Sequence, residues 1–490
     1  MNVDNILSKL SLKEQLLQLM MIDIRYFEAK KVYQLPLDLM DFMAKYEFGG
    51  IILFAENVEQ KNKIKYLVEQ IQKNSKITKL IGLDEEGGIV SRINGISTPG
   101  NMALGAINDV NVTQNIAQII GYELADYGIN LNFAPVVDIN SNPLNPIIGV
   151  RSFAGDKNIV TKHAQAFIAG LRQSNVISCV KHFPGHGDTV TDTHYTLSIV
   201  DKNECTMMDN ELFPYYELIK SNMIDMLMTA HIVAPQIDNN KLFATKINQL
   251  IDTPATFSYS ILTRLLRDKL AYTGVIISDA LDMGAIVNNF TQLEASIYAL
   301  IAGVDILLMP FRVWNKNDLR AFNQYFESLY TYVMQSDFLK QRVTESCLRV
   351  LQLKQNYFNK CNQNNNKIND AANYVDLIAK RGITLLNNNT LPWVINSEHK
   401  VLSLANNNLI LDEVQNITSS IGYTSDVLNY MCELDDIMMK INHYTHILLY
   451  SYNLTKPDPI LQQIIDKLNQ LNKPYVLIVT CNPYDVLYLN

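Results

Sequence analysis

The sequence lacks the long basic and apolar runs that mark several protein classes. Charged residues make up 18% of the 490 residues, the net charge is -8, and no long basic block occurs. Nucleic-acid and anionic-membrane partners are therefore not expected. No apolar run approaches the roughly 18 residues of a membrane span. The first twenty residues lack the cationic start and apolar core of a secretory signal, which predicts a cytoplasmic location.

Cysteine pairs and nucleotide-binding motifs are also missing. The six cysteines are scattered, with no C-x-x-C pair, which is typical of free thiols in a reducing cytoplasm. Neither G-x-x-x-x-G-K nor G-x-G-x-x-G occurs, so a Gly-rich phosphate loop is not expected. The sequence predicts no cofactor.

The length indicates two domains, because 490 residues exceed what one hydrophobic core usually organises. We expect a large domain over residues 1–357 and an Asn-rich linker over residues 358–373. Residues 374–490 should form a small three-layer α/β domain that is short or incomplete. Its expected strands are residues 382–386, 401–405, 446–452 and 475–480, and its expected helix is residues 459–471.

Short apolar runs recur through the first 310 residues, each followed by a helix-compatible segment such as residues 258–270 or 292–302. This alternation is typical of parallel strands covered by helices. Eight such units predict an α/β fold of the (β/α)8 TIM barrel type. The runs are residues 19–24, 50–54, 80–83, 131–137, 177–180, 226–229, 275–278 and 304–309.

Polar residues cluster at the C-terminal ends of these runs, including Asp84, Asp138, Lys181, His231 and Asp279. In a barrel those ends share one rim, where catalytic groups lie. The alternative, a doubly wound open sheet, would spread them along a crevice. The clustering favours the barrel.

The densest ionisable chemistry lies between Lys181 and His194. A run of apolar residues ends there, and Pro184 with two glycines then prevents regular structure. The spacing of His182, His186 and His194 suggests a metal site. However, the proline and glycines prevent the helical i, i+4 geometry of zinc hydrolases, and H-E-x-x-H is absent. We expect no metal, and we place the active site at this loop.

Two candidate catalytic groups follow from position. Asp192 and His194 are two residues apart, so both side chains can face one way in an extended segment. A carboxylate beside an imidazole makes the imidazole an acid/base near neutral pH, although spacing alone favours a solvated surface pair. Asp279 projects from the tip of a buried strand. It fits equally the cap of the next helix and the carboxylate nucleophile of a retaining glycosidase.

Asp84, Arg92, Arg151 and Lys181 could bind the hydroxyls of a polar ring. Each alone fits a salt bridge, but together at one rim they favour a ligand.

The order of these motifs resembles the glycoside hydrolase family 3 N-acetyl-β-glucosaminidases over about residues 10 to 350. The motifs are KHFPGHGDT from Lys181 with Asp192-x-His194, GLDEEGG from Gly82 with Arg92, NFAPVVD from Asn132, RSF from Arg151, AH from Ala230 and SDALDM from Ser278.

The resemblance implies a barrel enzyme that removes terminal N-acetylglucosamine from peptidoglycan fragments with retention. By this similarity Asp279 is the nucleophile, His194 the acid/base and Asp192 its partner. The implied sugar-binding residues are Asp84, Arg92, Arg151, Lys181 and His182. Thr193 replaces the usual serine and keeps its hydroxyl. Two alternatives stay open: phosphate rather than water accepts the glycosyl group, or the chain is a non-catalytic sugar-binding remnant.

Overall fold

The structure is a computed structural model that describes residues 3–189, 197–358, 368, 370–386, 392–393, 398–420, 425–432, 434–454 and 456–489. It contains two compact units, Met1–Ile383 and Thr384–Asn490. The expected start of the second domain, residue 374, falls inside α15 (Ala371–Arg381) of the first unit. There, Asn115 Nδ2 donates to the Tyr374 hydroxyl at 3.0 Å, and Arg381 pairs with Asp109 at 3.1 Å. These contacts place the division later in the chain than the sequence indicated. Most of the expected linker, residues 359–367, lies outside the described residues.

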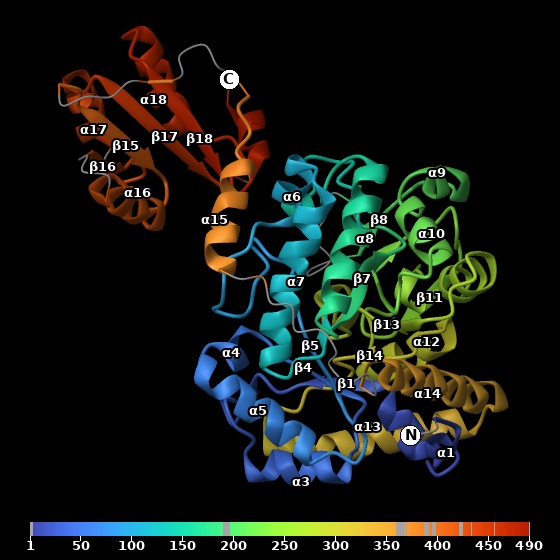
Figure 1. Cartoon of the computed structure of the whole chain (residues 1–490). Coiled ribbons are helices and arrows are strands. Elements are labelled where there is room, and N and C mark those ends of the chain that lie inside the picture. The colour runs from blue at the N-terminus through green and yellow to red at the C-terminus, as the bar shows by residue number, and fades with distance from the viewer. Residues whose placement is uncertain are drawn as a thin grey trace. The chain divides into compact units, whose positions relative to one another are not determined.

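The first unit is built around an eight-stranded sheet in which every paired neighbour is parallel. Its order is β13-β9-β7-β6-β5-β4-β1-β14. The edges meet where Ile306 N donates to Ile276 O and Ser278 N donates to Ile306 O, both at 3.0 Å. The predicted barrel is therefore confirmed as a nearly closed sheet (Figure 1). The strands are β1 (Met20–Asp23), β4 (Gly50–Ile52), β5 (Leu80–Leu83), β6 (Leu131–Asn132), β7 (Ile177–Phe183), β9 (Met226–Thr229), β13 (Val275–Ile277) and β14 (Leu307–Leu308).

All eight predicted strands are present, but five are shorter than predicted, and β6 and β14 lose the most residues. β6 ends at Asn132 rather than at residue 137, and Pro135 in the missing part has no N–H to donate to a sheet. β14 comprises only Leu307–Leu308. In contrast, β7 continues to Phe183 and carries Lys181 and His182 within the strand. The side chains of both residues are therefore fixed by the barrel.

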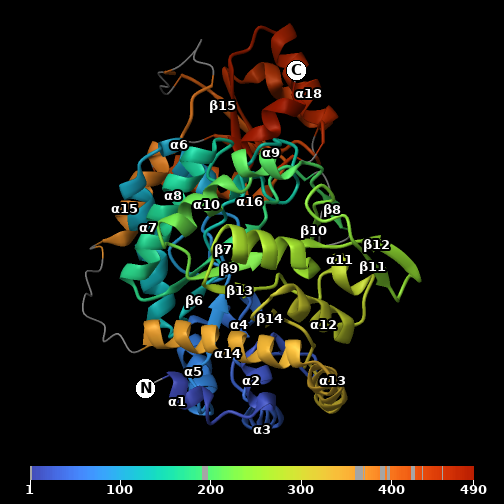
Figure 2. The same cartoon turned by 90° about the vertical axis from the view of Figure 1, so that its right-hand side faces the viewer.

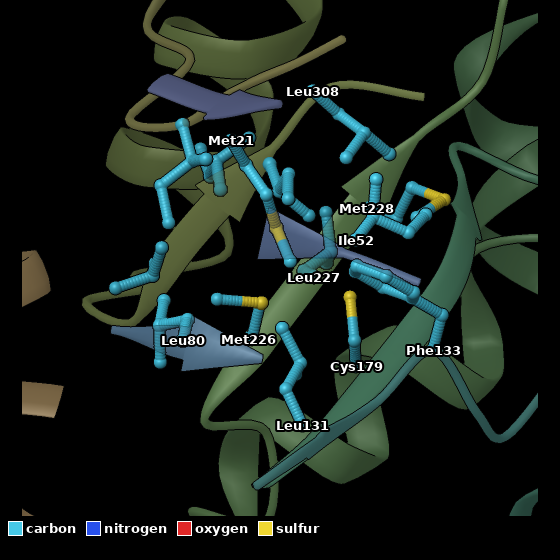
Figure 3. Packing of buried hydrophobic residues seen from close by; sticks show 14 of the residues in the cluster. Met21, Ile52, Leu80, Leu131, Phe133, Cys179, Met226, Leu227, Met228 and Leu308 are labelled. Atoms are coloured by element: carbon cyan, nitrogen blue, oxygen red, sulfur yellow. The ribbon is translucent and has the colours of Figure 1, made fainter. Parts of the chain in front are cut away.

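The barrel interior is apolar, as the continuous apolar runs require. Met21, Ile52, Leu131 and Met226 come from four different strands and are at most 2% exposed. Figure 3 shows these side chains converging, with Phe133 and Cys179 beside them. Such packing holds the strand ends at fixed relative positions.

The helices and short strands of the first unit cover the barrel. Asp109, Asp156 and Thr291 accept hydrogen bonds from N-terminal backbone N–H groups of three of these helices and so define where they begin. α14 packs against α1 and α2 (Figure 2). The helices are α1 (Val3–Leu7), α2 (Leu12–Gln18), α3 (Leu37–Lys45), α4 (Ala55–Val58), α5 (Lys61–Lys73), α6 (Asn101–Ile107), α7 (Val110–Asp126), α8 (Lys157–Gln173), α9 (Glu204–Asp209), α10 (Phe213–Lys220), α11 (Gly284–Val287), α12 (Gln292–Ala302), α13 (Lys316–Met334) and α14 (Asp337–Phe358).

Three further helical segments differ from ordinary α-helix. The predicted helix over residues 258–270 is present as the π-helix η3 (Ser260–Lys269). The 3-10 turn η2 (Ala255–Phe257) precedes η3, and the 3-10 turn η1 (Gly149–Arg151) precedes α8. The short strands are β2 (Tyr26–Phe27), β3 (Lys30–Lys31), β8 (Ser198–Ile199), β10 (Ile232–Val233), β11 (Lys241–Ala244) and β12 (Gln249–Asp252). Among the described residues, no helix combines the length and apolar character needed to cross a bilayer.

The second unit is a small α/β structure with a parallel four-stranded sheet of order β16-β15-β17-β18. The predicted strand over residues 382–386 is wrong, because this segment forms a turn and irregular chain. The strand β16, which carries charged and polar residues at its ends, was not predicted. The elements are β15 (Val401–Ala405), α16 (Asn408–Ser420), β16 (Asp426–Asn429), α17 (Leu434–Lys440), η4 (Ile441–His443), β17 (His446–Tyr452), α18 (Pro459–Gln470), β18 (Tyr475–Thr480) and η5 (Pro483–Tyr488).

Candidate active site

Asp279 lies two residues beyond β13, at the C-terminal rim of the barrel. Its backbone N–H donates to Thr229 Oγ1 at 3.4 Å, and its Oδ1 accepts from Ala280 N at 2.8 Å. The next helix, α11, has Met283 at its N-cap, so Asp279 does not cap that helix. The capping interpretation is therefore excluded, and the carboxylate remains available to a ligand.

The surroundings of Asp279 keep it ionised. Burial is the largest influence on its pKa and would raise it. His231, His182, Lys181 and the hydrogen bond from Ala280 N–H together outweigh burial and lower the pKa. A partly exposed carboxylate that is ionised at neutral pH can attack an electrophilic carbon.

Lys181 and Arg151 form a buried ionic network with two carboxylates. Lys181 Nζ lies 2.7 Å from Asp84 Oδ1 and 2.8 Å from Glu86 Oε1. Arg151 binds Glu86 through two hydrogen bonds, Nε to Oε2 at 3.0 Å and Nη2 to Oε1 at 2.8 Å. Burial opposes the charge on Glu86, but Arg151 and Lys181 outweigh it and hold the pKa of that carboxyl far below its usual value. The network presents fixed charged donors and acceptors at the C-terminal rim.

His182 is oriented by a buried carboxylate. Its Nδ1 lies 2.7 Å from Asp138 Oδ2, and because an ionised carboxylate only accepts, Nδ1 carries the proton. Burial would raise the pKa of Asp138, but His182 outweighs this effect and the pKa is lowered. The other ring nitrogen, Nε2, lies 3.5 Å from Arg151 Nη2. Nε2 therefore faces the charged network and can accept a hydrogen bond from a ligand hydroxyl.

The loop after β7 is anchored at its beginning. His186 N donates to Asp138 Oδ1 at 2.7 Å, and His186 Nδ1 lies 2.7 Å from Thr189 Oγ1. Lys202 Nζ lies 2.7 Å from both Asp188 and Glu211. Asp192 and His194, the predicted acid/base pair, lie outside the described residues.

Arg92 does not join the network of Lys181. Its backbone N–H donates to Glu85 Oε2 at 2.8 Å, while its side chain is partly exposed. Its buried Nε has no hydrogen-bond partner among the described residues. A ligand acceptor could supply this partner.

The structure thus brings together Asp84, Arg151, Lys181 and His182, with Asp279 electrostatically coupled to His182 and Lys181. The list of predicted site residues omitted Glu86, Asp138 and His231. Asp138 and His231 are among the polar residues noted at strand ends, and Glu86 follows β5 in the GLDEEGG motif. Their position at the ends of strands was the signal that could have identified them. Among the described residues, no group of three or more His, Cys, Asp or Glu side chains is arranged to bind a metal ion.

Comparison with known proteins agrees with this architecture. Residues 11–353 match the family model described as the glycosyl hydrolase family 3 N terminal domain. The chain is 40% identical over 367 residues to beta-hexosaminidase A of Pseudoalteromonas piscicida, covering 70% of this chain and 61% of that relative. It is 33% identical over 269 residues to a beta-hexosaminidase of Haemophilus influenzae, covering 53% of this chain and 72% of that relative.

A solved structure is similar over nearly the whole chain. The glycoside hydrolase family 3 beta-N-acetylglucosaminidase from Paenibacillus sp. str. FPU-7 has a TM-score of 0.82 at 29% identity, covering 98% of this chain and 92% of that one. The chain spans less than two thirds of the length of the first curated relative, 61%. Because the family model matches more than half of the sequence, the chain belongs to glycosyl hydrolase family 3.

Proposed function

We propose that the protein is a retaining exo-β-N-acetylglucosaminidase that releases terminal N-acetylglucosamine from peptidoglycan fragments in the cytoplasm. The proposal is carried by Asp279, an ionised carboxylate at the end of a barrel strand and electrostatically coupled to His182 and Lys181. The names of the relatives, beta-hexosaminidase and beta-N-acetylglucosaminidase, support the reaction and the sugar. The peptidoglycan substrate and the location rest on the sequence resemblance.

The reaction takes two steps in this proposal. An oxygen of Asp279 attacks the anomeric carbon, the bond to the leaving oxygen breaks, and the protonated imidazole of His194 donates its proton to that oxygen. Water then attacks the same carbon, His194 takes a proton from the water, and the Asp279 carboxylate is released. Two inversions give net retention. Asp192 stabilises the protonated imidazole.

The sugar would be bound by the charged network. Asp84 and the Nε2 atom of His182 accept hydrogen bonds from hydroxyls, while Arg151 and Lys181 donate to sugar oxygens. Arg92 donates from its unpartnered Nε. Because four of these five side chains are joined by the contacts above, the subsite is formed before the sugar binds.

Turnover of a nitrophenyl β-N-acetylglucosaminide by Asp279→Ala tests the nucleophile. We expect at least about a thousand-fold loss of kcat, and partial rescue by azide, which would give a glycosyl azide of inverted configuration. Asp282→Asn is the matched control, since Asp282 is a carboxylate three residues further along the chain that lies 3.9 Å from Arg25 and is not among the proposed site residues. Unchanged turnover by Asp279→Ala would refute the proposal.

Product analysis distinguishes the alternatives. Proton NMR should show the β-anomer of N-acetylglucosamine as the first product. Added phosphate should leave the product unchanged, whereas a sugar 1-phosphate would identify a phosphorylase. Binding of N-acetylglucosamine without any cleavage would identify a non-catalytic remnant.

A further inference from the structure

His231 connects two buried threonines to the residue that follows Asp279. It lies two residues beyond β9 and is 1% exposed. Its Nδ1 lies 2.9 Å from Thr256 Oγ1, and its Nε2 lies 3.0 Å from the carbonyl oxygen of Ala280. The role of this histidine depends on which ring nitrogens carry protons.

The neighbours of Thr256 decide where the protons lie. Thr256 has one hydroxyl proton, and its Oγ1 lies 3.0 Å from the carbonyl oxygen of Ala230, which can only accept. If that proton goes to Ala230, His231 Nδ1 must donate to Thr256. Ala280 O can also only accept, so Nε2 donates as well. A histidine that donates from both ring nitrogens is an imidazolium.

Thr229 completes the same pattern. Its Oγ1 lies 2.8 Å from Thr256 Oγ1 and accepts from the backbone N–H of Asp279 at 3.4 Å. With the Thr256 proton directed to Ala230 O, the hydrogen bond between the two threonines uses the proton of Thr229. A neutral His231 would instead take the proton of Thr256 and deprive the Ala230 oxygen of this hydrogen bond. Thr229, Thr256 and Ala230 are all fully buried. Leaving a buried acceptor such as the Ala230 oxygen unpaired costs about 1–3 kcal/mol.

We propose that His231 is held as an imidazolium and is the positioning residue for the Asp279 carboxylate, an inference that rests on the proposed function. Its Nε2–H fixes the Ala280 carbonyl, and the N–H of the same residue donates to Asp279 Oδ1 at 2.8 Å. The orientation of the carboxylate is therefore set through Ala280. The positive charge acts on the carboxylate directly.

The charge pair explains how a buried imidazolium is tolerated. Burial favours the neutral imidazole, and the nearby Asp279 carboxylate offsets this cost. The imidazolium in turn stabilises the ionised carboxylate: His231 is the strongest of the influences that lower the pKa of Asp279, although burial opposes it. Other titratable groups among the described residues that act on Asp279 include Cys179, Lys181, His182 and His186, which lie on β7 or shortly after it.

The positive charge of His231 affects the two proposed steps of the reaction in opposite directions. A cation beside Asp279 slightly weakens the attacking carboxylate, but it stabilises the carboxylate that is released when water cleaves the glycosyl–oxygen bond. Removal of the charge should slow the second step and cause the covalent intermediate to accumulate. kcat and KM should then fall together, a pattern that a purely structural defect does not give.

His231→Gln tests the charge, because its amide N–H can still donate toward Ala280 O while carrying no charge. We expect kcat to fall about tenfold with a parallel fall in KM, and the burst of nitrophenol to be larger. The acidic limb of the pH profile of kcat/KM should move to higher pH by about one unit. The matched control is His163→Gln. His163 is also buried on α8, and its Nδ1 lies 2.7 Å from Thr113 Oγ1, but it makes none of the contacts that join His231 to Ala280 and Asp279. We expect wild-type kinetics for this control.

Nitrogen NMR of 15N-histidine protein tests the charge state without turnover. The chain has eight histidines, and the His231 signals are assigned by their loss in His231→Gln, or by their shift in Thr256→Val if the first variant does not fold. We expect both ring nitrogens to be protonated at pH 7. A neutral His231 imidazole at pH 7 would overturn the inference. So would a His231→Gln variant whose pH profile of kcat/KM and nitrophenol burst match those of the wild-type protein. If wild-type protein fails to cleave the glycoside, the proposed function fails instead, while the NMR result still decides the charge of His231.

Discussion

Lys181 Nζ and Glu86 Oε1 lie 2.8 Å apart, and the side chain of each residue is only 2% exposed. Glu86 also accepts two hydrogen bonds from Arg151. One buried carboxylate thus compensates two cations at the C-terminal rim. A buried charge that loses its partner is strongly destabilising, whereas a surface ion pair contributes little.

Glu86→Gln should therefore lower the free energy of unfolding of the first unit by about 3 kcal/mol at pH 7. The amide has a similar shape but cannot compensate both cations. Urea unfolding measures the change. Glu59→Gln is the control, because Glu59 also pairs with a lysine, at 2.6 Å from Lys31, but both side chains are about half exposed. Equal effects of the two substitutions would show that the buried network contributes no more than a surface pair.

The barrel and most of its polar rim were predictable because they depend on local patterns. Apolar runs specify strands that are buried on both faces, and a polar residue at the end of a run must lie at the rim. The sequence could not distinguish neighbours within Asp84-Glu85-Glu86. Glu85 accepts from the backbone N–H groups of Arg92 and Ile93, whereas Glu86 binds Arg151 and Lys181. This difference depends on partners that are distant in sequence.

The end of the first unit was not predictable for a related reason. α15 has the apolar spacing of any amphipathic helix, and nothing local shows which core it joins. Tyr374 and Arg381 assign it to the first unit through contacts with Asn115 and Asp109, more than 250 residues earlier in the sequence. Similarly, the Asp279 side chain fitted a helix cap equally well until the N-cap of α11 was found at Met283.

Arg92 and Arg151 should respond differently to replacement by methionine. Arg92 has a buried Nε without a partner among the described residues, so Arg92→Met should leave the melting temperature unchanged or raise it. Arg151→Met removes a partner of Glu86 and should destabilise by about 3 kcal/mol. Both should raise KM for the nitrophenyl glycoside at least about tenfold, because each would lose the charged hydrogen bond that we propose it makes to the sugar. A large loss of stability in Arg92→Met would show that its side chain is structural.

Asp138→Asn tests whether the orientation of His182 matters for turnover. The asparagine can no longer offer two ionised oxygens to His182 Nδ1 and to the backbone N–H of His186. A hydrogen bond to a charged group contributes about 1.5–3 kcal/mol, so we expect kcat/KM to fall about tenfold to a hundredfold. A parallel variant, Asp138→Ala, should be worse, since it also leaves both donors without an acceptor. Wild-type kcat/KM in Asp138→Asn would exclude a role for the carboxylate charge.

His186 should make the stability of the protein sensitive to mild acid. Burial, the largest influence, lowers its pKa from 6.5 to about 4. A histidine with a lowered pKa binds a proton more readily in the unfolded chain, so its contribution to stability is present above pH 6.5 and is lost as the pH falls toward 4. At about 1.4 kcal/mol per pKa unit, the full loss is about 3 kcal/mol.

His186→Asn removes this titration and can keep the hydrogen bond from position Nδ1 toward Thr189 Oγ1. The free energy of unfolding should therefore fall less between pH 7 and pH 4.5 in His186→Asn than in the wild-type protein. Urea unfolding at several pH values measures the difference, and His443→Asn, at an exposed histidine, should behave like wild type. Parallel pH curves for His186→Asn and wild type would mean that His186 takes up its proton in the folded protein as easily as in the unfolded chain. In that case burial would not outweigh the charge of Asp138, which favours the imidazolium.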